Sequence, residues 1–416
     1  MKFWRAVLTL SSGSAVAMVA SVAGILILPR LYDPADFGRF GVFFGITGLF
    51  GGILTGGFDQ ALMLPKSDDE ARQLGVAGLL LSGAGVILAA IILGLTFLLP
   101  EYGLFHGWHG TEWLLPLALG LEGAILVGQG WKNRQSDYRR LALVRWLRPT
   151  LQVAASAGLF FVAGDTGLIL AWVVGQLGAM ALLWPKKIPA VRWDALIHST
   201  RAYQDFPRFS MVSQALNQAS RLLPFIMMPY FFGETEAGYF TQADRVLMLP
   251  MALVSLAAGQ VFYQDAARTW EQNPDALAPK TLSLTYRLLA MIVPFGLVMV
   301  LFAPEGFSWV MGPGWARSGE YARWLTPWLV MAFLASPLSF LVDVRRQLPA
   351  LLWFNLGLFV VRIGALAVCA LFLPALQAVA VYGFAGSVMV LGEIIWFLQL
   401  GGVWAYIRKK KPGNTA

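Results

Sequence analysis

Three arginines interrupt long apolar stretches in the second half of the chain: Arg221, Arg245 and Arg362. A charged side chain in a membrane helix costs roughly 2.5–3.5 kcal/mol on insertion scales, so such residues are functional candidates by default. At about 1.5 Å per residue, each arginine lies roughly 12–15 Å from the outer end of its stretch, near the middle of a ~30 Å hydrocarbon core. Since arginine keeps its proton, each charge requires an anion or water nearby.

Two interpretations of these arginines are open. In the first, they pair with buried carboxylates and only hold helices together; Asp244, Glu122 and Glu393 are available. Asp244 is a poor direct partner for its neighbour Arg245, because adjacent helical side chains point about 100° apart. In the second interpretation, the arginines line a water-filled cavity between two halves of the protein and bind an anionic substrate, since guanidinium forks suit phosphate oxygens.

The cavity interpretation extends to further residues within or beside the apolar stretches. Glu122 and Glu393 are then candidates for cavity or coupling-ion groups. The other polar candidates for the cavity are Asp244, Asn217, Gln218 and Gln129.

Twelve apolar segments must position these residues. We predict that they are membrane helices, because the runs are long, lack strict alternation and contain Gly and Pro, whereas barrel strands are shorter and alternate. The first segment is long enough to span and is therefore predicted to be retained rather than cleaved as a signal peptide. The segments lie at 6–28, 37–63, 73–99, 113–131, 142–163, 166–184, 207–231, 237–262, 282–303, 322–342, 350–372 and 376–405.

The composition agrees with a chain solvated largely by lipid. Hydrophobic residues make up 57% and charged residues 13%, against about 25% charged in a typical soluble domain. The net charge of +8 does not indicate a nucleic-acid partner, because Lys and Arg follow the positive-inside rule. With the N-terminus in the cytoplasm, 24 of the 31 lie on the cytoplasmic side and 4 on the opposite side. Both termini are then cytoplasmic.

A short turn occurs twice in the sequence. The stretch "LPRLYDPADFGRF" (28–40) matches "MPYFFGETEAGYF" (228–240), with Gly38 aligned to Gly238. Six predicted spans separate the copies, so both lie on the same side, as in two parallel six-helix repeats; a helix–turn–helix connection that arose twice is the other explanation.

We predict an all-α polytopic membrane protein with two six-helix bundles around a central cavity. The expected domains are 1–185, a cytoplasmic linker 186–206, and 207–416.

Several quoted stretches carry a resemblance to a known family. They are "LPRLYDPADFGRFGVFFGI" with "TGGFDQALMLPKSDDEARQL", the segment 203–268 that begins "YQDFPRF", and "MGPGWARSGEYARWLTPWLV". In order and spacing these resemble bacterial polysaccharide flippases of the Wzx type, within the multidrug/oligosaccharidyl-lipid/polysaccharide (MOP) exporter superfamily. The resemblance extends from Met1 to about Phe372.

The resemblance implies a bacterial inner-membrane transporter that works by alternating access. Its implied substrate is a glycan repeat unit on undecaprenyl pyrophosphate, moved from the cytoplasmic to the periplasmic leaflet, as in O-antigen, lipopolysaccharide or exopolysaccharide synthesis. Arg245, in "QADRVLMLP", stands where the family usually has an arginine of a cationic cavity. Arg221 and Arg362 are assigned by depth and charge, and we expect no mid-span arginine in the N-terminal half. Glycan polymerase and other assembly-pathway membrane proteins are candidate partners.

No phosphate-binding loop, nucleophile motif or zinc motif occurs in the sequence, so we expect neither enzymatic activity nor a cofactor or metal. Whether H⁺ or Na⁺ drives transport is open. The alternatives are an ion-coupled multidrug exporter of the same superfamily, which would place carboxylates rather than arginines at mid-depth, and a membrane-embedded glycan polymerase or ligase, which would need a large outer loop. A helical bundle that recruits assembly enzymes would not require mid-membrane arginines.

Overall fold

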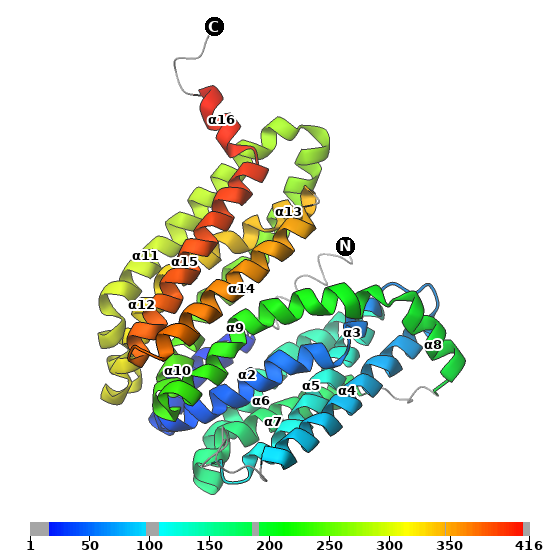
Figure 1. The fold of residues 1–416 in the computed structure, drawn as a ribbon, viewed down its shortest axis with the longest axis vertical. Coiled ribbons are helices and arrows are strands. Elements are labelled where there is room, and N and C mark those ends of the chain that lie inside the picture. The colour runs from blue at the N-terminus through cyan, green and yellow to red at the C-terminus, as the bar shows by residue number, and fades with distance from the viewer. Residues whose placement is uncertain (1–15, 97–107, 185–190, 346, 411–416) are drawn as a thin grey trace. The chain divides into compact units, whose positions relative to one another are not determined.

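The computed structural model describes residues 16–96, 108–184, 191–345 and 347–410, and every regular element in these ranges is helical (Figure 1). An apolar helix covers Val16–Arg30. The long helices that follow are α2 (Pro34–Leu54), α4 (Asp68–Thr96), α5 (Leu114–Arg134), α6 (Tyr138–Ala163), α7 (Gly167–Leu183), α9 (Met211–Phe232), α10 (Glu234–Gln272), α11 (Leu277–Met311), α12 (Ala316–Leu338), α14 (Leu348–Ala370) and α15 (Ala375–Leu400). The shorter helices are α3 (Phe58–Ala61), α8 (Trp193–Ala202), α13 (Phe340–Val344) and α16 (Val403–Lys410).

Each predicted span overlaps a described helix, apart from residues 6–15 of the first span and 97–99 of the third, which lie outside the described residues. The last span, 376–405, is interrupted, because α15 ends at Leu400 and α16 begins at Val403. The second predicted span differs, because its helix ends at Leu54 instead of continuing to residue 63. Gly56 and Gly57 follow with φ of +65° and +73°, a left-handed conformation that glycine adopts without steric cost. The chain then enters the short helix α3.

Eight helical stretches in the described residues are long and apolar enough to cross a membrane. One of them, Tyr138–Leu183, contains both α6 and α7. Helix α9 is not among the eight, since Asn217, Gln218 and Arg221 lower its hydropathy. The all-α polytopic fold class is confirmed, and α9 carries three of the predicted site residues.

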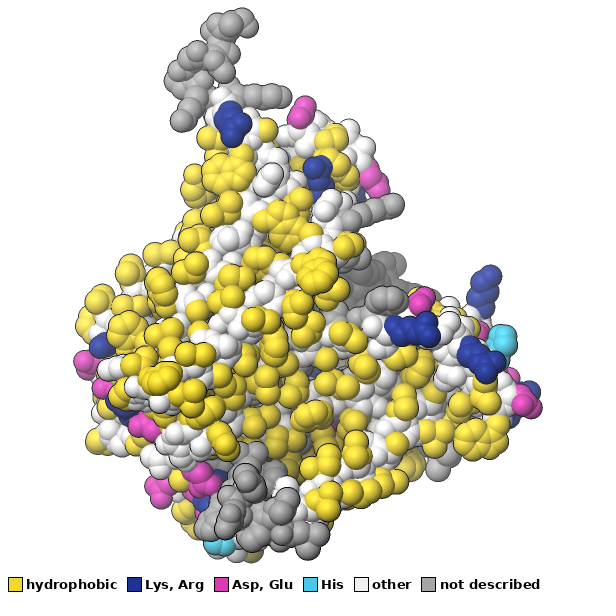
Figure 2. Space-filling model, in the orientation of Figure 1, with side chains coloured by type: hydrophobic (Ala, Val, Ile, Leu, Met, Phe, Trp, Pro, Cys, Tyr) yellow, Lys and Arg dark blue, Asp and Glu magenta, His cyan; other side chains and the backbone are white. Residues whose placement is uncertain are grey.

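Hydrophobic side chains cover the outer faces of the helices, as lipid contact requires. In Figure 2, hydrophobic groups spread over the helix faces, and most charged groups gather near helix ends. Ile87 on α4 and Phe302 on α11 are examples, with exposed fractions of 64% and 59%. Large apolar surfaces of this kind are unfavourable in water. The protein is therefore a multi-pass membrane protein.

The chain forms two compact units, Met1–Gly238 and Tyr239–Ala416. In the first unit, α6 packs on α7, α4 on α5, and α2 along α9. In the second, α12 packs between α11 and α15, and α15 also contacts α14. Helix α9, which begins the second sequence repeat, thus packs in the first unit; the domain boundaries at 185 and 207 remain a prediction.

The two copies of the repeated turn contact each other reciprocally within the first unit. A methyl group built on Gly38 would overlap the backbone oxygen of Glu234, and one built on Gly238 would overlap the backbone oxygen of Pro34. Both glycines therefore permit the close backbone approach that small residues allow between membrane helices. Pro34 and Glu234 are themselves separated by the repeat offset of 200 residues. The reciprocity is that expected of repeats related by a twofold axis.

Charged residues from four predicted outer loops meet beside this contact, and we call them the outer-end cluster. Arg39 Nη2 lies 2.6 Å from Asp36 Oδ1 and 3.0 Å from Asp165 Oδ2. Its Nε lies 3.9 Å from Glu234 Oε2. Nε2 of His109 is 3.6 Å from the same Asp165 oxygen. Asp36 and Arg39 lie at the start of α2 and Glu234 at the start of α10, while Asp165 and His109 lie between helices. All of them share one end of the unit, as the predicted alternation of loops between two sides requires.

Candidate functional site

Arg362 is the most deeply buried of the three predicted arginines. It lies in α14 of the second unit, and 3% of its surface is exposed. Its Cζ atom is 4.1 Å from the ring centroid of Trp328 on α12 and 4.2 Å from that of Tyr382 on α15. Cation–π contacts at this range stabilise a guanidinium, the more so where water is excluded. Two helices, α12 and α15, therefore contact this charge through aromatic rings.

The polar edge of Arg362 lacks protein partners. Nε and Nη2 are sealed from solvent and have no hydrogen-bond partner in the described part of the chain. No carboxylate in the described ranges lies within ion-pair distance of this guanidinium. Asp244 on α10 attracts it over a longer range. A buried, charged donor without a partner lowers stability by about 1–3 kcal/mol or more. An additional acceptor at this edge would therefore be stabilising.

Glu393 does not supply that acceptor. It lies on α15, is 8% exposed, and makes no hydrogen bond or ion pair to another described residue. Glu393 follows Gly386, the α15 residue beside Arg362, by seven positions. Two helical turns separate these positions, which is about 10 Å along the axis. Glu393 is thus a second buried ionisable group on the same helix face, distinct from the arginine site.

Arg245 and Asp244 lie next to each other on α10, in the second unit, and both are half-buried. Each interacts with neighbouring groups, and Asp244 is the one that attracts Arg362. The prediction that these adjacent side chains are poor direct partners of each other stays a prediction.

Arg221 and Asn217 lie one turn apart on α9, in the first unit, and both are exposed. The next residue, Leu222, is buried and contacts the α2 backbone near Gly45 and Gly48. One face of α9 thus packs on α2, while a polar stripe faces away. Gln218 is half-buried.

Glu122 has partners that the sequence did not single out. Its Oε2 accepts a hydrogen bond from Arg148 Nη2 at 2.8 Å and a second one from Gln176 Nε2. The Arg148 guanidinium also lies 5.7 Å from the ring centroid of Trp172. These groups come from α5, α6 and α7 of the first unit. The pairing interpretation therefore applies to Glu122, with Arg148 as the partner.

The expectation of no mid-span arginine in the N-terminal half is wrong. Arg148 lies well inside α6, which begins at Tyr138 and runs to Ala163. The Lys and Arg count places Arg148 among the 24 cytoplasmic residues, although it lies inside the predicted span 142–163. The signal that could have found it is Glu122, a carboxylate within an apolar stretch that requires a cationic partner. Gln129, two turns further along α5, is half-buried.

Removing the Glu122 carboxylate should destabilise the first unit. In Glu122→Ala, Arg148 loses its anionic partner while it stays largely buried, with a side chain that is 29% exposed. We expect a loss of about 1–3 kcal/mol, seen as a lower melting temperature in detergent. The control is Asp69→Ala, which removes a more exposed ion pair with Arg72 and should change stability by less than about 1 kcal/mol. Equal effects of the two variants would contradict a structural role for Glu122.

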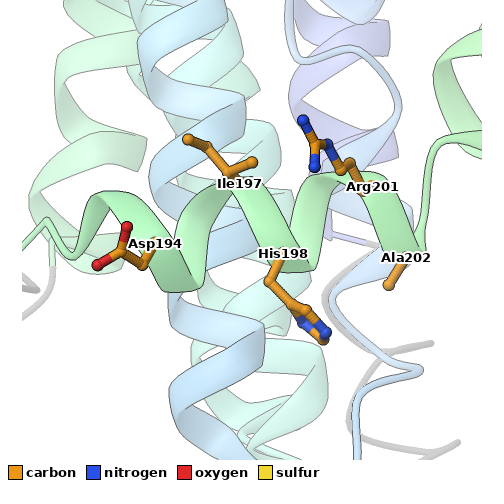
Figure 3. A pocket seen from close by; sticks show the side chains of 5 residues that line it. All are labelled: Asp194, Ile197, His198, Arg201 and Ala202. Atoms are coloured by element: carbon orange, nitrogen blue, oxygen red, sulfur yellow. The ribbon is translucent and has the colours of Figure 1, made fainter.

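The structure also contains a surface pocket of about 460 Å³ on α8, in the predicted linker. Its lining residues all come from this one helix, and Figure 3 shows their side chains pointing in different directions. They include none of the predicted site residues. The pocket is lined by Asp194, Ile197, His198, Arg201 and Ala202. It is therefore not the candidate site.

Comparison with known proteins decides the family. Residues 27–320 match the model of the polysaccharide biosynthesis protein family, which is more than half of the chain. The chain belongs to the polysaccharide biosynthesis protein family. This membership confirms the resemblance to MOP-superfamily polysaccharide flippases. Among curated proteins, no relative matches the chain.

Solved structures with the same fold include other transporters. This polysaccharide biosynthesis family member matches an inward-facing multidrug resistance MATE family transporter of the MOP superfamily with a TM-score of 0.69, at 18% identity over 98% of this chain and 99% of that chain. It matches the lipid II flippase MurJ with a TM-score of 0.72, at 10% identity over 98% and 94%. A MOP superfamily transporter from Pyrococcus furiosus gives 0.60, at 17% identity over 96% of each chain. These likenesses establish the fold of a MOP transporter or flippase.

Proposed function

We propose that this protein is a flippase that moves an undecaprenyl-pyrophosphate-linked oligosaccharide from the cytoplasmic to the periplasmic leaflet by alternating access. The observation that carries the proposal is the buried Arg362 guanidinium, whose polar edge has no partner in the described chain. A member of a polysaccharide biosynthesis family with such a group is suited to an anionic, glycan-bearing lipid. Arginine binds phosphate oxygens with two parallel hydrogen bonds.

The chemistry of the substrate explains why a protein is required. The pyrophosphate and sugars are charged and hydrated and cannot cross hydrocarbon without a large cost, whereas the prenyl tail can remain in lipid. Arg362 and Arg245, both in the second unit, would hold the phosphate groups. The roles predicted for Arg221, Asn217, Gln218 and Gln129 of the first unit remain predictions.

A multidrug exporter is the second candidate, because the fold also matches a MATE family transporter. Such a protein would accept cations, which the Arg362 and Arg245 charges repel. Glu122 would favour this candidate if it were unpaired, but its carboxylate is bound to Arg148 and Gln176. We therefore favour the flippase.

Orientation, coupling and partners follow from the same proposal. Membership of a polysaccharide biosynthesis family supports a location in the bacterial inner membrane, and the distribution of Lys and Arg favours cytoplasmic termini. Movement of the head could be coupled to H⁺ or Na⁺, and Glu393 is the buried carboxylate best placed for that role, since it has no ion-pair partner in the described residues. A glycan polymerase that receives the flipped lipid is the expected partner.

Removal of the Arg245 charge should abolish glycan export. In cells that lack the wild-type protein, we expect Arg245→Gln to insert at normal levels and the lipid-linked intermediate to accumulate on the cytoplasmic leaflet. The control is Arg345→Gln, which removes a guanidinium that lies 4.1 Å from the ring centroid of Trp270, at the end of α13. Normal export by Arg245→Gln would contradict its role, and export unaffected by deletion of the protein would contradict the flippase.

A further inference from the structure

We propose that helix α8 is an interfacial anchor, which inserts Trp193 and Ile197 into the cytoplasmic leaflet and binds the phosphates of phospholipid headgroups through Arg201. Helix α8 belongs to the first unit and contains none of the residues proposed to bind the transported substrate. The anchor would therefore act whatever the substrate is. The position of α8 and the pattern of its exposed side chains both favour a lipid surface.

Helix α8 lies near the point where the lipid-facing surface of α4 begins. The backbone N–H of Arg192 donates a hydrogen bond to Gln73 Oε1 at 3.3 Å, and Leu196 belongs to the same apolar cluster as Leu74. Along α4, the exposed large hydrophobic side chains begin at Leu79. Five residues of helix, from Leu74 to Leu79, rise only about 7.5 Å, which is comparable to the thickness of one headgroup layer.

Helix α8 crosses α4 instead of running beside it. Figure 1 places α8 across one end of the first unit, and Figure 3 shows its axis transverse to the helices behind it. A helix that is transverse to a membrane-spanning helix lies along the plane of the membrane, as interfacial amphipathic helices do. The ten residues Trp193–Ala202 rise about 15 Å, so α8 is too short to span the bilayer itself.

The side chains of α8 form a packed face and an apolar strip beside it. Leu196 and Ser199 are buried, and they belong to the packed face. Trp193 and Ile197 are one turn apart and are 64% and 44% exposed. Four residues advance about 40° around a helix, so these two side chains share one strip, and His198 follows about 100° further round. Tryptophan is enriched where membrane meets water, so the strip suits insertion at that level.

Arg201 lies next to the apolar strip. It follows Ile197 by one turn, and in Figure 3 both side chains extend from the same side of α8, whereas His198 extends from the other. Arg201 is exposed and forms no ion pair with a described residue. Its aliphatic stem can follow the helix surface while the guanidinium reaches a lipid phosphate. The acidic residue of α8, Asp194, lies in the first turn, where it complements the helix dipole.

A lipid surface fits this strip better than a protein partner does. Specific protein interfaces cover about 800 Å² on each partner, whereas the strip consists of two side chains. The order around the helix is apolar, then cationic, then polar, which is the order of hydrocarbon, phosphate and water across a membrane interface. Basic residues near the cytoplasmic leaflet are also attracted by its anionic lipids.

The test reads the surroundings of single spin labels on α8 in the purified full chain. Cys369 is the only cysteine of the chain, so Cys369→Ser provides the background. Ile197→Cys carries the label on the apolar strip, and His198→Cys is the matched control on the other side. The protein is reconstituted in vesicles of phosphatidylcholine and phosphatidylglycerol. Collisions of each label with oxygen, which concentrates in lipid, are compared with collisions with a water-soluble nickel chelate.

We expect the oxygen-to-nickel collision ratio to be severalfold higher at position 197 than at position 198. Arg201→Gln should lower the ratio at position 197, because the helix loses its headgroup contact, and Arg201→Lys should retain it. Since all three replaced side chains are exposed, the melting temperatures should stay close to that of the Cys369→Ser background.

Three results would overturn the anchor. Equal ratios at positions 197 and 198 would show that the strip faces water. An unchanged ratio in Arg201→Gln would exclude the headgroup contact. A label at position 197 that is accessible to nickel in vesicles but shielded in native membranes would indicate a protein partner instead of lipid. Each result leaves the proposed transport function untouched, because that function is measured by glycan export.

Discussion

Gly238→Ala is expected to destabilise the first unit strongly. The new methyl group would overlap the backbone oxygen of Pro34, which cannot rotate away as a flexible side chain would. Either α10 or α2 must move, and overpacking of a well-packed contact costs about 3 kcal/mol. The expected result is a large fall in melting temperature in detergent, with less folded protein in the membrane.

A double-mutant cycle can show that the two glycines form one contact. Gly38→Ala should have a similar effect, because its methyl group would overlap the backbone oxygen of Glu234. Once one methyl group has separated the backbones, the second has room, so the double variant should cost less than the sum of the single variants. Gly52→Ala, where the new Cβ meets nothing within 4 Å on the same helix α2, should be near neutral. Strict additivity would contradict the reciprocal contact.

Arg39→Gln is expected to have the second large effect on stability. The Arg39 side chain is 13% exposed and is the common cationic partner of Asp36, Asp165 and Glu234. Its removal leaves three carboxylates close together, of which Asp36 is the least exposed at 10%. Breaking a buried ion pair by removing one partner typically costs about 3–5 kcal/mol. Chemical unfolding in detergent should show a loss of that order for Arg39→Gln.

The control for Arg39 is another arginine of the predicted outer side. Arg317 pairs with Glu320 at 2.7 Å, but the two side chains are 36% and 40% exposed. Exposed pairs contribute about 0–1 kcal/mol, so Arg317→Gln should change stability little. If the two variants were equally stable, the outer-end cluster would not hold the loops together.

The arrangement of helices could be predicted from the sequence because it depends on local properties. Apolar length sets each span, and the Lys and Arg bias sets the side of each loop. The repeated turn with Gly38 and Gly238 predicted a symmetry that appears as a reciprocal contact. The helix break at Gly56 and Gly57 was missed because hydropathy continues through it, whereas the backbone needs two left-handed residues there.

The candidate site could be predicted only in part, since depth along a helix does not say which side chains face one another. Arg362 followed from its charge within an apolar run, but the stacking by Trp328 and Tyr382 depends on the packing of three helices. Arg148 was missed because the Lys and Arg count grouped it with the basic residues that precede it in the sequence, whereas it lies inside α6.

The most direct test of the flippase is transport in proteoliposomes. The purified protein is reconstituted with a fluorescent oligosaccharide on undecaprenyl pyrophosphate, and a membrane-impermeant glycosidase reports which leaflet holds the sugar. We expect the protected sugar to become accessible much faster than in protein-free vesicles, and Arg362→Lys to abolish this acceleration. If the sugar becomes accessible no faster than in protein-free vesicles, the proposed function is contradicted. If the same vesicles also transport a cationic dye, the result favours a multidrug exporter.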